Sequence, residues 1–161
     1  MALELPGDIR PILETACTAQ QTTLIDVVLR GTKERAMLEL YVDTPAGITL
    51  EQCESINRAL LVAAESSAFL DAVRSIEVSS PGTDRPLIHW WQFPRNKGRT
   101  LELTYTKEDA QVTESLILIE ADEQKLIVQQ PKKKSKIKTD EDTTFSLPYS
   151  EIHKAIVLIS L

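Results

Sequence analysis

The chain of 161 residues has the length of one medium-sized domain or two small ones, which excludes a large multidomain enzyme. Hydrophobic residues make up 42% and charged residues 26%, near the averages of globular proteins, so the composition argues against general disorder. The net charge of −6 belongs to residues 1–80, which hold 6 Lys and Arg against 12 Asp and Glu, whereas residues 81–161 hold 12 of each. An acidic first half does not favour a nucleic-acid surface, so we expect phosphate contacts mainly from the second half.

Alternating and helical patterns of apolar residues predict a mixed α/β layer in the first half. The expected elements are a helix at 8–19, strands at 22–30 and 36–43, a helix at about 50–66 and a strand at 76–80. Thr49 and Gln52 have the spacing of a capping box at the start of the second helix. The resulting order, αββαβ, predicts two helices on one face of a three-stranded sheet.

The apolar face of the second helix is expected to contain the residues at helical spacing that follow its cap, namely Leu50, Cys53, Ile56, Leu60 and Ala63. Cys53 is therefore predicted to be a core residue, and Cys17 lies too far along the chain to form a C-x-x-C pair with it. Neither a secretory signal nor a membrane-spanning run is visible, so we expect a cytoplasmic protein.

The second half changes character after the turn signal at Pro81 and Gly82. A short aromatic connector at 87–93 contains adjacent tryptophans, Trp90 and Trp91, and at least one is expected to be buried against the second domain. Short apolar runs then follow at 101–105, 116–119, 126–128, 143–147 and 155–159. Short strands at this spacing predict a small β-barrel of SH3-like or Sm-like size. We therefore predict an α+β protein with an α/β domain at 1–82 and a barrel domain at 83–161.

No motif in the sequence calls for catalysis. Phosphate-binding and dinucleotide-binding glycine motifs and the nucleophile elbow are missing. The two histidines, His89 and His153, are too few for most histidine-based metal sites. We predict no catalytic, cofactor-binding or metal-binding residues, and hence a protein that is not an enzyme.

Two segments are candidates for binding. The first is the turn between the domains, which is either a rigid hinge or a binding loop and comprises Ser80, Pro81, Gly82, Asp84, Arg85 and Pro86. The second is a run of lysines, which is either a solvated loop or a surface that contacts rRNA phosphates or protein and comprises Lys132, Lys133, Lys134, Lys136 and Lys138.

The segment from Glu77 to Leu87 reads E-V-S-S-P-G-T-D-R-P-L. It resembles the signature of the ribosome maturation factor RimP family, E-V-S-S-P-G-L-D-R-P-L, and differs from it only at Thr83. The stretches at 40–53 and 147–155 are similar to the family's strand-turn-helix entry and to its closing segment. The three blocks stand in the family's order and together extend over most of the chain.

The resemblance implies a KH-like N-terminal domain, an SH3-like or Sm-like barrel, and a non-enzymatic role in maturation of the small (30S) ribosomal subunit in the bacterial cytoplasm. The implied partner is the subunit precursor, which the protein contacts through a basic ribosomal protein, 16S rRNA or both. The resemblance implies no membrane, small-molecule substrate or cofactor. We expect a monomer. Residues 31–34 depart from the G-x-x-G clamp with which KH domains hold RNA. The alternative function is a general Sm-like RNA-binding module that acts outside the ribosome.

Overall fold

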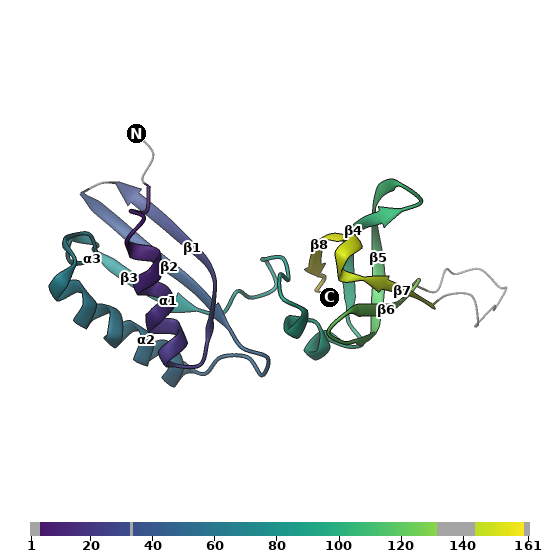
Figure 1. Ribbon diagram of the computed structural model, residues 1–161, viewed down its shortest axis with the longest axis horizontal. Coiled ribbons are helices and arrows are strands. Elements are labelled where there is room, and N and C mark those ends of the chain that lie inside the picture. The colour runs from purple at the N-terminus through teal and green to yellow at the C-terminus, as the bar shows by residue number, and fades with distance from the viewer. Residues whose placement is uncertain (1–3, 33, 132–143, 160–161) are drawn as a thin grey trace. The chain divides into compact units, whose positions relative to one another are not determined.

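The computed structural model describes residues 4–32, 34–131 and 144–159. The chain divides into two compact units, Met1–Pro81 and Gly82–Leu161, and each unit has its own β-sheet and its own hydrophobic core (Figure 1). The mixed α+β class expected from the sequence is confirmed by these two sheets and the few helices.

The first unit is a three-stranded sheet with helices on one face (Figure 1). Its elements are α1 Ile9–Ala19, β1 Thr23–Thr32, β2 Arg35–Asp43, α2 Leu50–Ala63, a 3₁₀ turn Ala64–Ser66, α3 Ala68–Ala72 and β3 Ser75–Ser79. The strand order is β1-β2-β3, with β1 antiparallel and β3 parallel to β2. The parallel pair requires a crossover, and the helical segment from α2 to α3 provides it.

Strict alternation along β2 decides which face of the sheet is covered. Leu38, Leu40 and Val42 are fully buried under the helices, whereas Met37 on the opposite face is 40% exposed. The helices complete this core with Ile9, Leu13, Ile56 and Leu60. Since side chains alternate across a strand, the sequence pattern alone indicated this arrangement.

The predicted capping box at the start of α2 is present. The Thr49 hydroxyl accepts a hydrogen bond from the Gln52 N–H at 3.1 Å, and Gln52 Oε1 accepts one from the Thr49 N–H at 2.9 Å. The prediction that Leu50 is a core residue is wrong, because its side chain is 76% exposed. Leu50 is the first residue of α2, and helical periodicity does not say where along a helix the packing against a neighbouring sheet begins.

The second unit is an antiparallel sheet with the strand order β7-β6-β5-β4-β8. Its strands are β4 Thr100–Lys107, β5 Ala110–Ala121, β6 Lys125–Gln129, β7 Thr144–Pro148 and β8 Ile152–Val157. A 3₁₀ turn, Tyr149–Glu151, joins β7 to β8. In the part of the chain that the structure describes, β7 and β8 are the sheet's two edges, so the strand pairings do not close the expected barrel.

Neither tryptophan of the aromatic connector is fully buried, although the sequence predicts that at least one packs into the core of this domain. Trp90 is 41% exposed, and Trp91 is half-buried and stacks on His89 with 5.1 Å between ring centroids. Phe93, at 3% exposure, takes the place in the core instead. A 3₁₀ turn, Trp90–Gln92, sets consecutive side chains in different directions, so only one aromatic residue of this run is fully buried.

Gly31 in the β1-β2 hairpin provides a test of the first unit. Its φ is +91°, and a Cβ atom placed there would lie 2.2 Å from the Arg35 carbonyl oxygen. We expect Gly31→Ala to lower the free energy of unfolding by about 2–5 kcal/mol, because a left-handed backbone and a steric clash both oppose the methyl group. Urea unfolding followed by circular dichroism measures the change.

Gly47→Ala is the matched control, since Gly47 has a φ of +86° but no atom within 4 Å of the added Cβ. Its cost should be only the backbone penalty of about 1–2 kcal/mol. Equal losses of stability in the two variants would show that the Arg35 carbonyl oxygen does not exclude a Cβ atom at residue 31.

Candidate binding groove and connecting segment

The segment between β3 and the aromatic connector contains no helix or strand. The boundary between the two units falls between Pro81 and Gly82, and Gly82 has a φ of +67°, which favours glycine. Pro81 is buried, Arg85 and Pro86 are half-buried, and the others of the predicted set, Ser80, Gly82 and Asp84, are exposed. The predicted lysine cluster, Lys132 to Lys138, lies outside the described residues.

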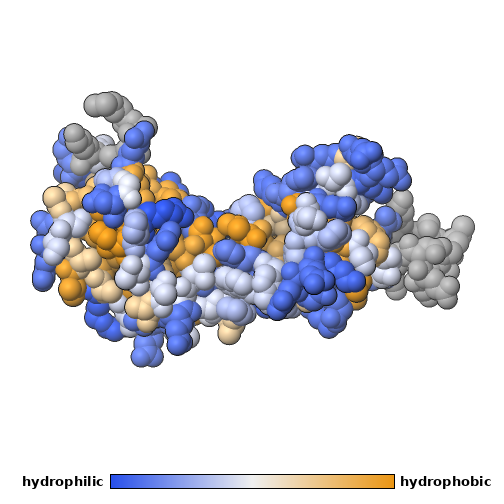
Figure 2. Space-filling view, in the orientation of Figure 1, coloured by the Kyte–Doolittle hydropathy of each residue, from blue (hydrophilic) through white to orange (hydrophobic). Residues whose placement is uncertain are grey.

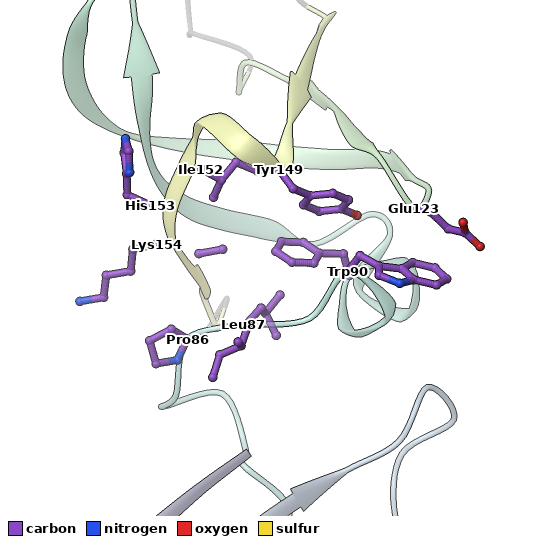
Figure 3. Close-up of a pocket in the computed structure, with 11 residues that line it drawn as sticks. Pro86, Leu87, Trp90, Glu123, Tyr149, Ile152, His153 and Lys154 are labelled. Atoms are coloured by element: carbon purple, nitrogen blue, oxygen red, sulfur yellow. The ribbon is translucent and has the colours of Figure 1, made fainter. Parts of the chain in front are cut away.

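The second unit contains a groove of about 480 Å³ that begins where this segment ends. Its lining comes from the connector, from the turn before β6, from the 3₁₀ turn before β8 and from β8 itself (Figure 3). The apolar and aromatic residues among them include Pro86, Leu87, Ile88, Trp90, Phe93, Tyr149 and Ile152. Among the described residues of the two predicted binding segments, only Pro86 lines this groove.

Backbone hydrogen bonds hold the connector against the sheet. The Leu87 N–H donates to the Ala155 carbonyl of β8 at 2.8 Å. Gln92, only 1% exposed, then accepts from the N–H groups of Ile88 and His89 through its side-chain oxygen, at 2.8 and 2.9 Å. Asn96 Nδ2 donates to the Gln92 carbonyl at 2.8 Å. Buried amides that satisfy backbone groups in this way fix the course of the chain.

Tyr149 forms the floor of the groove together with Phe93. The two rings lie 5.2 Å apart between centroids at an angle of 54°, a tilted geometry that aromatic pairs favour. The Tyr149 hydroxyl donates to the Asp122 carbonyl oxygen at 2.8 Å. Burial, assisted by the nearby Asp122 charge, raises the pKa of Tyr149 to about 12, so the phenol remains a neutral donor at pH 7.

The two ends of the groove differ in charge (Figure 3). Glu123 lies at the end occupied by Trp90, whereas His153 and Lys154 lie at the other end. Next to Glu123, the Asp122 carboxylate accepts from the N–H groups of Gln124 and Lys125 at 2.7 and 2.8 Å. These bonds lower the pKa of Asp122 and keep it ionised. An apolar channel with opposite charges at its ends suits an extended protein segment.

Neither a cluster of metal ligands nor a membrane-spanning helix is found among the described residues. Within the described residues, no three His, Cys, Asp or Glu side chains gather as metal ligands. No helix in this part of the chain has the length and apolar character needed to span a bilayer.

Residues 12–84 match the family model described as the RimP N-terminal domain. The first unit is a RimP N-terminal domain. This match confirms the RimP resemblance predicted from the sequence. It runs from α1 through β3 and ends at Asp84, inside the connecting segment whose residues carried that resemblance.

No sequence pattern indicates the groove. Trp90 was expected as a core candidate, and Glu123 and Tyr149 were not singled out. The aromatic run is the feature of the sequence that could have indicated the groove. It has three aromatic residues within four positions, Trp90, Trp91 and Phe93, which is more than one short turn can bury.

Gln92 tests how the connector is held. Gln92→Leu would leave the part-buried N–H groups of Ile88 and His89 without their acceptor, so we expect the second unit to lose about 1–3 kcal/mol of stability. Thermal unfolding of the full chain measures the loss.

Gln111→Leu, at an exposed position on β5, makes the same chemical change and should stay within about 0.5 kcal/mol of wild type. A Gln92→Leu variant as stable as the Gln111→Leu variant would contradict a structural role for the Gln92 amide.

Proposed function

We propose that this protein assists maturation of the small ribosomal subunit in the bacterial cytoplasm by binding the immature particle without catalysing a reaction. The observation that carries the proposal is the RimP N-terminal domain at residues 12–84. The residues Arg85 to Leu87 continue the family signature past the end of that domain and support extending the assignment to the second unit.

The finer fold assignments belong to the same proposal. A three-stranded sheet with helices on one face supports a KH-like first unit. Five short antiparallel strands with a 3₁₀ turn, Tyr149–Glu151, before the last strand support an SH3-like or Sm-like second unit. We propose that residues 80–86 form the hinge between these two domains.

We assign the contacts with the particle to different parts of the chain. The groove of the second unit has the chemistry of a protein contact, since it is apolar in the middle and charged at both ends. The lysine cluster, with five positive charges in seven residues, supplies phosphate contacts. The first unit is acidic overall and suits basic protein surfaces rather than rRNA.

Co-sedimentation tests the function directly. We expect the purified chain to sediment with free small subunits and not with large subunits or complete ribosomes. Asp84→Ala and Arg85→Ala in the hinge should weaken this binding while each domain stays folded, because hinge residues alter function without touching the partner. Thr83→Ala in the same segment is the control and should bind as wild type does.

Two outcomes would contradict the proposal. Binding to a naked structured RNA as tight as binding to small subunits would favour the Sm-like module that acts outside the ribosome. Unchanged binding in both hinge variants would make the segment an ordinary connector.

The lysine cluster is tested by the salt dependence of small-subunit binding. Each phosphate neutralised contributes about −0.7 to −0.9 to the slope of log affinity against log salt concentration. Replacing all five lysines with glutamine should flatten the slope by roughly 2 if two or three contacts are lost. The melting temperature should barely change, since exposed charges contribute little to folding. An unchanged slope in the folded variant would assign the cluster to solubility alone.

A further inference from the structure

We propose that the Trp90 end of the groove is a binding subsite for a cationic side chain, lysine or arginine, from an extended segment of a protein partner. The subsite consists of the indole of Trp90, the carboxylate of Glu123 and the neighbouring ring of Tyr149 (Figure 3). These residues define the chemistry of the ligand, and only the partner's place in the ribosomal particle rests on the proposed function.

The exposure of Trp90 is imposed by its surroundings. The 3₁₀ turn that contains it is fixed by the buried Gln92 side chain, which accepts from two backbone N–H groups at the entry to the turn. Phe93, next in the chain, occupies the core. Trp90 is therefore held at the groove with 41% of its surface exposed, and it needs no rearrangement to meet a ligand.

An exposed indole next to a carboxylate favours a cation. Trp is the aromatic side chain with the strongest attraction for ammonium and guanidinium groups, and a carboxylate beside it adds Coulomb attraction. Around the start of β6, the negative charges of Asp122 and Glu123 outweigh the single positive charge of Lys125, the first residue of that strand. The local charge therefore complements a basic side chain.

The same end of the groove disfavours an anion such as an rRNA phosphate. The hydroxyl of Tyr149 donates to the Asp122 carbonyl, so its proton is already used. The Asp122 carboxylate stays ionised because it accepts two backbone N–H groups, and Glu123 beside it is exposed. Bringing a phosphate here would set its negative charge beside the carboxylates of Asp122 and Glu123, which repel it.

The rest of the groove indicates what flanks the basic side chain. Leu87, Ile88 and Ile152 give the middle an apolar lining, and Ile88 is 60% exposed. An extended segment with a Lys or Arg beside aliphatic residues therefore matches both the lining and the charge. His153 and Lys154 at the far end favour the opposite charge and orient the segment along the groove.

Nuclear magnetic resonance of the full chain tests the subsite with a defined probe. The probe is the capped peptide acetyl-Leu-Arg-Leu-amide, and its control is the same peptide with citrulline, which keeps the shape of arginine but has no charge. We expect saturable shifts of the Trp90 indole signal and of the Ile88 and Tyr149 amide signals with the arginine peptide. The citrulline peptide should bind at least about fivefold more weakly.

Variants separate the two parts of the subsite. Trp90→Ala should weaken binding of the arginine peptide roughly tenfold, and Trp90→Phe should recover part of the loss, since phenylalanine retains a weaker aromatic face. Glu123→Gln should weaken binding roughly threefold. Glu102→Gln on β4, which removes the same charge away from the groove, should bind as wild type does. Melting temperatures verify that each variant is folded.

Three results would overturn the subsite: equal binding of the citrulline peptide, wild-type affinity in folded Trp90→Ala, or saturation of the same signals by an oligouridylate. These results are independent of the ribosomal assignment. If the chain sediments with small subunits but fails these tests, the subsite is wrong and the proposed function stands. If the arginine peptide binds as expected but small subunits do not, the subsite stands and the proposed function is wrong.

Discussion

The arrangement of the second unit depends on one buried amide. Where the chain enters this unit, the N–H groups of Ile88 and His89 need an acceptor, and the side chain of Gln92 supplies it from within the core. An N–H group that loses its hydrogen bond to water on folding and gains no other acceptor costs about 1–3 kcal/mol of stability, so this requirement dictates the path of the connector. With the path fixed, Phe93 lies in the core and Trp90 at the groove.

Tyr149 links this connector to the β6 side of the sheet. Its ring packs against Phe93, and its hydroxyl reaches the backbone of Asp122, so one side chain joins two segments that are distant in the sequence. The turn that carries Asp122 and Glu123 is held at the rim of the groove by this bond and by the backbone bonds to the Asp122 carboxylate. The ring of Trp90 and the negative charge of Glu123 are therefore held in place before a ligand binds. Binding to groups that are already ordered loses little conformational entropy.

The two units differ in net charge, and the groove belongs to the second of them. The RimP N-terminal domain buries its apolar residues between one sheet face and the helices α1, α2 and α3, and it carries the chain's excess of acidic residues. The second unit has a nearly balanced charge and contains the groove. Under the proposed function, the acidic first unit repels rRNA phosphates, while the groove of the second unit accepts protein segments.

The sequence by itself determined the elements that depend on local rules. The alternation along β2 and the spacing of Thr49 and Gln52 are properties of neighbouring residues, and they predicted the covered sheet face and the capping box. The segment from Glu77 to Leu87 likewise indicated the family. Only the tertiary structure decided that Leu50 is exposed, that Phe93 rather than Trp90 is buried, and that Glu123 lies beside Trp90. The local bonds of Gln92 set the path of the connector, but the packing of Phe93 on Tyr149 and the place of Glu123 depend on residues far apart in the chain. No periodicity within a short window contains that information.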